Sequence, residues 1–270
     1  MIFCMNDTFS DHDSTSNIDR IAPTHKPAGS PIGYQSWQDL TFIHWRVSAE
    51  EIQKLIPDSL TVDTFDGSAW IGLVPFAMRN VRPWWSPVVP GVSHFLETNV
   101  RTYVHKEGAD PGVWFFSLEA SQALAVHIAR RFWKLNYYYS AMSLKKTSDQ
   151  VLYQSQRRWP KPIPANSDVT IGFHQSEEHR TFQISELGTF DHFLLERYYL
   201  YASDSLRNPS AGKLYRGQVH HDPYQFCRAD LVHCREELVQ QAGIQILSEA
   251  EHIAYSPGVD VEIHSLKPVG

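Results

Sequence analysis

Residues 95–104 read FLETNVRTYV, and this stretch says most about the fold. Successive side chains of a β-strand point to opposite faces, so the alternation predicts a strand with one mainly apolar face and one polar face. Leu96, Thr98, Val100, Thr102 and Val104 fall on the first face, and Glu97, Asn99, Arg101 and Tyr103 fall on the second.

The polar face has two interpretations. It is either an outer, solvated wall or an inward-turned row of hydrogen-bonding groups. The neighbouring strands are strongly apolar, and the four polar residues differ from the Lys/Glu/Thr set typical of a solvated face. Both features favour an inward row, which would form a polar patch in an aromatic cavity. A buried carboxylate beside a guanidinium would stay charged and could serve as a base or a ligand anchor.

The sequence on both sides of this strand adds further strands. Residues 108–112, GADPG, predict a turn, and 113–120, VWFFSLEA, predict the returning strand. On the other side, Asp66-Gly67 lies between two strand-like runs and is a strong hairpin signal. Short helices are expected at 48–57, where Ser48 would be the N-cap, at 121–133, at 189–202 and at 235–243.

Many strands, several hairpins and few short helices indicate a mainly β (α+β) fold, either a barrel or a sandwich. Strands and long helices do not alternate, so a doubly wound parallel sheet is not expected. No GxGxxG or P-loop motif is present. Residues 1–32 are polar and rich in Ser, Asp, Thr and Pro, which predicts a disordered or loosely packed tail, and residues 33–270 are expected to form one domain.

Composition excludes several classes of protein. The 270 residues carry 24 basic and 30 acidic side chains, and a net charge of -6 argues against nucleic-acid binding. Three cysteines form neither a disulfide framework nor a zinc motif, so we expect no bound metal, no cofactor and a cytoplasmic location. No apolar run is long enough to span a membrane, and the first 13 residues lack the features of a signal peptide.

Several stretches, taken in order, resemble the uncharacterised YqjF-like family over residues 34–268. They include SWQDLTFIHW at 36–45, LETNVRTYV at 96–104, LLERYYLY at 194–201 and YSPGVDVEIHSL at 255–266. This resemblance implies the fold of acetoacetate decarboxylase, a closed β-barrel with a central cavity.

Residues 45–142 also resemble acetoacetate decarboxylase itself. The resemblance places its essential glutamate on Glu97 and an arginine on Arg130. It also places the lysine that forms a Schiff base on Tyr137. A phenol cannot form an imine, so decarboxylation through an imine is not expected. We expect Lys134 and Lys145-Lys146, the nearby alternatives, to be solvated.

Other residues qualify as site candidates. His44 lies on a strand face with Leu40 and Phe42, which suits either a hydrogen-bonded core residue or a cavity acid/base, and its match to the family favours the second. His220 and His221 are adjacent on a predicted strand, so they would face opposite sides and rarely share an ion. Trp84 and Trp85 suit a cavity lid, a subunit contact in a homo-oligomer, or ordinary surface packing.

Two functions follow from these candidates. In the first, the protein is an enzyme of the lyase or hydro-lyase type that acts on a small carbonyl or carboxylate compound. The resemblance and the residues assign catalysis to Glu97, His44 and Tyr137, and ligand binding to Asn99, Arg101, Tyr103 and Arg130. In the second, motivated by the missing lysine, the protein binds a small metabolite without catalysis.

Overall fold

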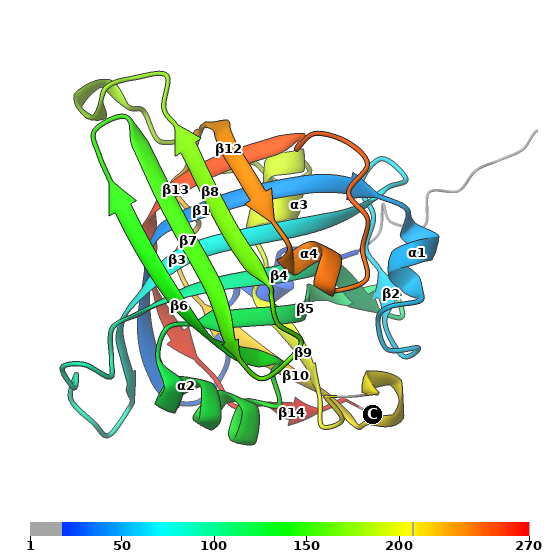
Figure 1. Ribbon diagram of the computed structural model, residues 1–270. Coiled ribbons are helices and arrows are strands. Elements are labelled where there is room, and N and C mark those ends of the chain that lie inside the picture. Colours follow the sequence, from blue (N-terminus) through cyan, green and yellow to red (C-terminus); the bar gives the residue numbers. More distant parts are fainter. Residues whose placement is uncertain (1–17, 207, 270) are drawn as a thin grey trace, which may run out of the picture.

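The computed structural model describes residues 18–206 and 208–269, and in this part of the chain fourteen strands join into one sheet with a few short helices (Figure 1). The helices are α1 (Ala49–Gln53), α2 (Ala123–Ile128), α3 (Phe190–Leu195) and α4 (Leu238–Gln241). The strands are β1 (Gly33–Val47), β2 (Thr61–Val62), β3 (Ala69–Pro83), β4 (Phe95–Lys106), β5 (Ala109–Ala120), β6 (Tyr137–Lys146), β7 (Gln150–Trp159), β8 (Asn166–Gly172), β9 (Tyr199–Ser203), β10 (Leu214–His220), β11 (Cys227–Arg228), β12 (Asp230–Glu236), β13 (His252–Ile263) and β14 (Lys267–Pro268).

Strand pairing closes a ring. Within the described residues, seven strands pair in the order β5-β9-β10-β13-β1-β3-β4, and β4 then pairs with β5 again. The closure depends on β5, which is antiparallel to β4 along one edge. Along its other edge β5 is parallel to β9 over Gly112–Trp114 and to β6 over Leu118–Ala120. The expectation of a mainly β fold built on a closed sheet is therefore confirmed.

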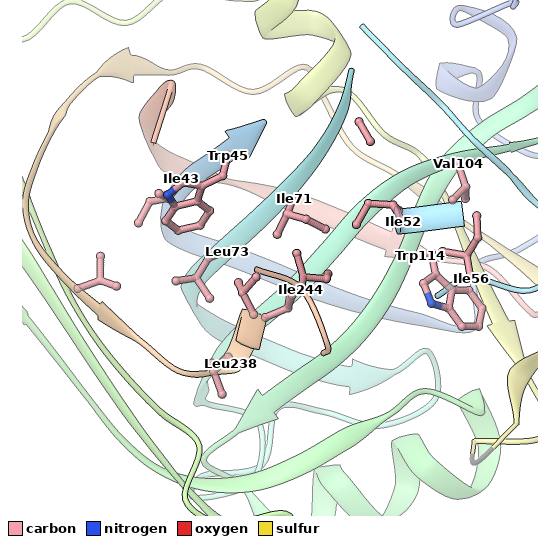
Figure 2. Packing of buried hydrophobic residues seen from close by; sticks show 14 of the residues in the cluster. Ile43, Trp45, Ile52, Ile56, Ile71, Leu73, Val104, Trp114, Leu238 and Ile244 are labelled. Atoms are coloured by element: carbon pink, nitrogen blue, oxygen red, sulfur yellow. The ribbon is translucent and has the colours of Figure 1, made fainter. Parts of the chain in front are cut away.

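A second layer covers the outside of this ring. Strands β6, β7, β8 and β12 extend from β5 and lie in front of β1 and β3 (Figure 1). A large apolar core fills the space between the layers. In Figure 2, Leu238 of α4 and Ile244, which follows α4, pack toward Ile71 and Leu73 of β3. This core holds one face of β4, because Val100 and Val104 belong to it.

The opposite face of the ring strands forms the interior of the ring. Side chains from β1, β3, β4, β5, β9 and β13 belong to one apolar cluster, and a smaller cluster from β10 and β13 shares Trp37 and Val259 with it. Helix α3 and the segment around Tyr224 and Phe226 contribute to the same interior. The cluster includes Leu40, Phe42, Val74, Phe76, Phe95, Leu118, Ala120, Val126, Leu135, Tyr137, Leu195, Ala202, Tyr224, Phe226 and Ala254.

Two local predictions are confirmed. Asp66 and Gly67 have φ angles of 50° and 70°, as the favoured two-residue hairpin turn requires, and Phe65 pairs with Ser68 across them. The side chain of Ser48 caps α1 by accepting a hydrogen bond from the amide of Glu51.

Two helix predictions are wrong in part. The helix expected at 189–202 ends at Leu195, and Tyr199–Ser203 form β9 because this segment pairs with β5 and β10. The helix expected at 235–243 keeps only Leu238–Gln241, since the preceding residues extend β12. In both cases strand pairing overrides the local helical pattern.

The N-terminal region of the chain contacts the ring in its described part. Both terminal nitrogens of the Arg20 guanidinium donate to Asp63, at 2.6 and 2.8 Å, and Gln218 donates to the Pro23 carbonyl. Residues 1–17 of the expected tail lie outside the described residues, and the boundary near residue 32 stays a prediction. No helix in the described ranges is both long and apolar enough to cross a membrane.

Candidate functional site

The polar row of β4 is buried. Glu97, Asn99, Arg101 and Tyr103 expose 3%, 5%, 8% and 0% of their surface, so the row lies inside the protein and not on a solvated wall. Register explains which groups meet there. In the pairing of β3 with β4, Glu97 lies opposite Phe76, Asn99 opposite Val74 and Arg101 opposite Gly72. Strand β3 therefore places two apolar side chains and a glycine beside the row, and no polar group.

Glu97 and Tyr137 form a buried pair at one end of the row. The Tyr137 hydroxyl donates to Oε2 of Glu97 over 2.8 Å. Burial raises the pKa of Glu97 to about 8, and the hydrogen bond from Tyr137 acts in the opposite direction. Burial also raises the pKa of Tyr137 well above its ordinary value. Glu97 is therefore a neutral carboxylic acid near pH 7, with a proton that it can donate. The expectation that it stays charged beside a guanidinium is wrong, because burial dominates and no arginine acts on its pKa.

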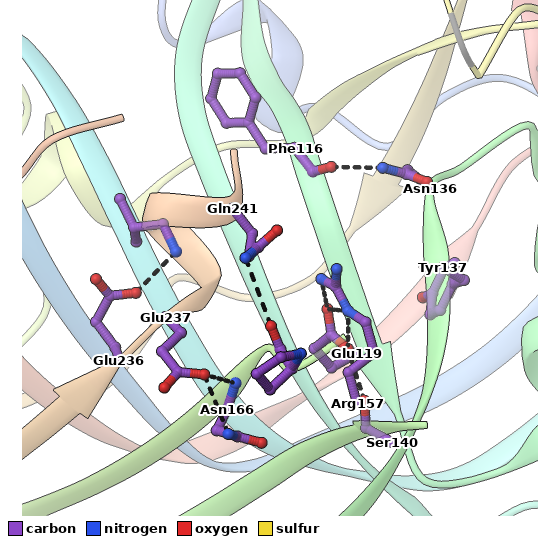
Figure 3. A network of polar contacts seen from close by, with 12 residues as sticks. Phe116, Glu119, Asn136, Tyr137, Ser140, Arg157, Asn166, Glu236, Glu237 and Gln241 are labelled. Carbon is purple, nitrogen blue, oxygen red and sulfur yellow. Dashed lines mark hydrogen bonds and ion pairs between the residues drawn. The ribbon is translucent and has the colours of Figure 1, made fainter. Parts of the chain in front are cut away.

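Backbone contacts fix Tyr137 in this position. Tyr137 lies beside Leu118 in the parallel pair of β5 and β6, and the Asn136 side chain donates to the Phe116 carbonyl (Figure 3). Arg130 donates to the backbone carbonyl of Tyr137 over 2.6 Å. Arg130 therefore supports the strand that carries Tyr137, and its guanidinium otherwise lies over the rings of Tyr138 and Trp159, away from the row on β4.

The pH dependence of stability tests the protonation of Glu97. In the unfolded chain this carboxyl loses its proton near pH 4.5, whereas in the folded chain it keeps it until about pH 8. The folded state binds more protons between these values, so stability falls there as pH rises, by on the order of 1 kcal/mol per pH unit, and levels off above pH 8. We expect Glu97→Gln to remove this fall in denaturant titrations between pH 5 and 9. Parallel curves for the two proteins would contradict the assignment.

Arg101 is a buried cation without an anionic partner. In the described part of the chain two further guanidinium groups are buried, and each pairs with a carboxylate, Arg157 with Glu119 and Arg197 with Asp63. Arg101 makes no ion pair within the described residues. One of its terminal nitrogens donates to the Leu194 carbonyl over 3.1 Å, and its guanidinium lies 5.5 Å from the centre of the Phe42 ring. A charge removed from water without compensation is costly.

One atom of Arg101 and one of the neighbouring Asn99 also lack hydrogen-bond partners. Nε of Arg101 and Oδ1 of Asn99 are buried and make no hydrogen bond within the described chain. Buried polar groups are nearly always paired, and each exception needs an explanation. The row thus offers a cation, a free donor and a free acceptor, and a small anionic ligand that also carries a hydroxyl group would satisfy all three.

His44 joins a second hydrogen-bonded group at the Arg101 end of the row. Nε2 of His44 lies 2.7 Å from the Tyr103 hydroxyl, and its Nδ1 lies 2.9 Å from Nδ1 of His252 on β13. Gly72 leaves room for this arrangement, because a Cβ there would lie 3.0 Å from the His44 ring. The predicted candidates thus separate into a Glu97–Tyr137 pair and a His44–Tyr103–Arg101 group, both on the inner face of the ring.

Sequence reasoning missed His221. Its Nδ1 donates to the Asp222 carbonyl over 2.7 Å, while its Nε2 is buried without a partner in the described chain. Burial lowers its pKa to about 4, so the ring is neutral and Nε2 is a free acceptor. The ring stacks on Tyr198 and contacts Tyr224, which in turn packs on Phe42. Strand alternation was the available signal, since it sends His220 and His221 to opposite sides.

His221 also lines a surface pocket of about 520 Å³. Arg82 and Lys26 belong to the same lining. Because His221 contacts the interior residue Tyr224 as well, it lies between this pocket and the ring interior.

The lysines near Tyr137 in sequence lie elsewhere. Lys134 stacks on Tyr215 at 4.8 Å from the ring centre and lines a small pocket beside Trp114. Lys146 donates to Asp39 and to the Tyr255 hydroxyl, both at 2.9 Å. The partners of both amines thus lie away from Glu97, which is bound by Tyr137.

Comparison with solved structures gives the fold. The chain is similar to an acetoacetate decarboxylase from Legionella pneumophila, with a TM-score of 0.62 and 13% identity over 90% of this chain and 88% of that one. It is also similar to the enduracididine biosynthesis enzyme MppR complexed with pyruvate, with a TM-score of 0.61 and 10% identity over 91% and 93% of the two chains. An acetoacetate decarboxylase-like enzyme from Sphingomonas wittichii RW1 also has a TM-score of 0.61, at 10% identity over 90% and 94%. The expected acetoacetate decarboxylase-like fold is confirmed.

Sequence comparison gives the family. The chain is 35% identical to the uncharacterized protein YqjF of Bacillus subtilis (strain 168) over 236 residues, which are 87% of this chain and 91% of that protein. Residues 34–260 match the model of the family DUF2071, described as an uncharacterized conserved protein (COG2071). The expected YqjF-like relationship is confirmed, and the chain belongs to the DUF2071 family.

Proposed function

We propose that this protein binds a small carboxylate in the ring interior and acts on it as a lyase or hydro-lyase, without a Schiff base. The observation that carries the proposal is the buried Arg101 guanidinium, which has no anionic partner in the described chain. A ligand carboxylate supplies the missing charge. The planar guanidinium suits it, because its fork of donors matches the two carboxylate oxygens.

The neighbouring groups favour a ligand that carries further oxygens. Oδ1 of Asn99 and Nε2 of His221 are free acceptors, so a hydroxyl or an enol of the ligand can donate to them. Asn99 lies between Arg101 and Glu97 on the same face of β4, so a ligand that extends from Arg101 toward Glu97 passes it. The class that fits is a small oxo or hydroxy acid.

Glu97 supplies the acid. Its carboxyl is neutral near pH 7 and receives a hydrogen bond from Tyr137, so its proton is available to a leaving hydroxyl or a developing enolate oxygen. In a dehydration, the Glu97 proton and the leaving hydroxyl form water, and the C–H proton passes to a base at the opposite end of the row. Tyr137 keeps the Glu97 side chain oriented and forms no covalent bond.

The structural neighbours support the class of ligand. MppR, which shares this fold, is described as complexed with pyruvate, a small oxo acid. Pyruvate is therefore the first probe, followed by acetoacetate and by hydroxy acids of three to six carbons.

A turnover screen tests the proposal. Each acid is incubated with the wild-type protein and with Glu97→Gln, and products are followed by proton NMR. We expect turnover of at least one acid by the wild type and a loss of about 100-fold or more in Glu97→Gln, since general acid catalysis contributes about 10²–10⁴-fold. Equal rates would contradict the role of Glu97. Binding without turnover would show a metabolite-binding protein and no enzyme.

Borohydride trapping tests the absence of a Schiff base. Reduction in the presence of pyruvate leaves the protein mass unchanged if no amine reacts in the interior, because Tyr137 cannot form an imine. A stable adduct on Lys134 or Lys146 would contradict this part of the proposal.

A further inference from the structure

A chain of hydrogen bonds connects the protein surface with the Arg101 end of the interior. Asp191 on α3 lies 3.1 Å from Nε2 of His252, and Nδ1 of His252 lies 2.9 Å from Nδ1 of His44. Nε2 of His44 lies 2.7 Å from the Tyr103 hydroxyl, which lies 2.8 Å from the Leu194 carbonyl. Asp191 is the only partly exposed side chain of the four that form this chain, at 16%.

Proton counting shows that this chain has two arrangements. Each of the four contacts needs one proton between its two atoms. Neutral His252, His44 and Tyr103 supply three, because each imidazole carries one proton and the phenol carries one. The fourth contact is filled only when the chain holds one more proton.

The three-proton arrangement has a fixed direction. His252 must donate from Nε2, because Asp191 is a carboxylate that can only accept. Its Nδ1 is then an acceptor, so His44 donates from Nδ1 and accepts from the Tyr103 hydroxyl at Nε2. Arg101 satisfies the Leu194 carbonyl in this arrangement, through the 3.1 Å contact. Every donor along the chain therefore points from the interior toward Asp191.

We propose that Asp191, His252, His44 and Tyr103 form a proton relay, which takes a proton from a ligand bound beside Arg101 and holds it on His252 against Asp191. This inference rests on the proposed function, because it supplies the base which that reaction needs. A ligand proton passes to the Tyr103 oxygen as the phenolic proton passes to Nε2 of His44. The Nδ1 proton of His44 passes to Nδ1 of His252 in the same step.

The products of this step balance. The ligand loses one proton and keeps the electron pair of the broken C–H bond as an enolate beside the Arg101 guanidinium. Tyr103 is neutral again and free to donate to Leu194. His44 is neutral with its proton on Nε2. His252 is an imidazolium that donates to both His44 and Asp191, so all four contacts are filled.

Most of the surroundings keep this end state unpopulated at rest, and Asp191 is the group that favours it at His252. Burial lowers the pKa of His44 and of His252, and the charges of Arg101 and Arg228 act in the same direction on His44. At His252 the charge of Arg228 also lowers the pKa, whereas the hydrogen bond and charge of Asp191 raise it. Arg228 pairs with Asp191 over 2.6 Å, and the hydrogen bond with His252 and the charge of Arg228 lower the pKa of Asp191 although burial raises it. The relay is therefore neutral near pH 7, ready to accept a proton, and gains its fourth proton only at lower pH.

Nitrogen NMR of the histidine rings tests the relay without any ligand. We expect the Nδ1–H tautomer for His44 and the Nε2–H tautomer for His252 at pH 8. On acidification, His252 should gain a second proton while His44 changes to the Nε2–H tautomer, with a single shared midpoint. Asp191→Asn keeps an acceptor but removes the counterion, so we expect that midpoint to fall by about one pH unit.

Two variants complete the experiment. Asp230→Asn is the matched control, because Asp230 makes a similar contact of 3.0 Å with the exposed His174 and should leave the shared midpoint unchanged. Tyr103→Phe should keep the Nδ1–H tautomer of His44 at pH 8, because His252 fixes it, but it removes the acceptor for Nε2–H in the acid form and should lower the shared midpoint. Separate midpoints for His44 and His252, or no effect of Asp191→Asn, would overturn the relay.

The relay and the proposed function fail in different ways. If the relay is wrong, carboxylates still bind to the wild type while the two rings titrate separately. If the proposed function is wrong, the coupled transition persists while pyruvate, acetoacetate and the hydroxy acids all fail to bind. With a substrate in hand, His252→Gln should lower kcat and flatten its pH profile with little change in KM.

Discussion

Replacing Arg157 with methionine should lower the free energy of unfolding by about 3–5 kcal/mol, because it leaves the buried carboxylate of Glu119 without a cation. Arg157 and Glu119 expose 2% and 0% of their side chains. Nε of Arg157 lies 3.1 Å from Glu119, and Ser140 donates to the same carboxylate over 2.6 Å (Figure 3). The guanidinium of Arg157 also stacks on Tyr138, 3.5 Å from the ring centre. The pair joins β5 to β6 and β7, which form the second layer. Equilibrium unfolding in denaturant measures the loss.

The double variant Glu119→Met with Arg157→Met is the control. Apolar replacement of a whole buried ion pair is often neutral, so this variant should recover most of the stability that Arg157→Met loses. An Arg157→Met protein within about 0.5 kcal/mol of the wild type would contradict this account of the pair, because such values are typical of exposed sites.

Arg101→Met should have the opposite effect, with stability kept and carboxylate binding lost. No buried carboxylate is left unpaired by this change, because Arg101 has no ion-pair partner in the described chain. We expect the free energy of unfolding to change by less than about 1 kcal/mol. A charge-assisted hydrogen bond contributes about 1.5–3 kcal/mol, so affinity for a bound acid should fall by about 10- to 100-fold. Isothermal titration calorimetry measures the affinity.

Arg82→Met is the matched control for binding. Arg82 lines the surface pocket that includes His221, and its guanidinium stacks on Tyr34 at 4.5 Å. If the carboxylate binds inside the ring, Arg82→Met keeps the wild-type affinity. Loss of binding in Arg82→Met together with unchanged binding in Arg101→Met would move the site to the surface pocket.

Strand periodicity was sufficient to predict the polar row. The alternation in 95–104 separates Glu97, Asn99, Arg101 and Tyr103 from the apolar residues, and the same rule put His44 on a face with Phe42. The contact of Glu97 with Tyr137 was also predictable, because the resemblance to acetoacetate decarboxylase marks both positions. A period of two residues is a local property, so one sequence reveals it.

Contacts between segments that are far apart in the chain could not be predicted from the sequence. His252 lies 208 residues after His44 in the chain, and the register of β1 and β13 alone brings their rings together. Asp191 was hidden in a predicted helix of 14 residues that in fact ends after Leu195. That Arg101 has no ion-pair partner could not be predicted either. Which carboxylates lie near its guanidinium is known only once all the neighbouring strands are placed.

Closure of the ring of strands also depends on contacts between segments that are distant in the sequence. Strand β5 was predicted as the second strand of a hairpin with β4, which is correct. Its parallel pairing with β6 and β9 leaves no local signal, because those strands follow after intervening helical segments. The closed sheet was thus an expectation from resemblance and strand count.

A crystal structure of the protein soaked with pyruvate tests the carboxylate site most directly. We expect the carboxylate within hydrogen-bond distance of the Arg101 guanidinium, with the opposite end of the molecule toward Asn99 and Glu97. Pyruvate bound only in the surface pocket beside Arg82, or an interior that stays unchanged at saturating pyruvate, would contradict the proposed site.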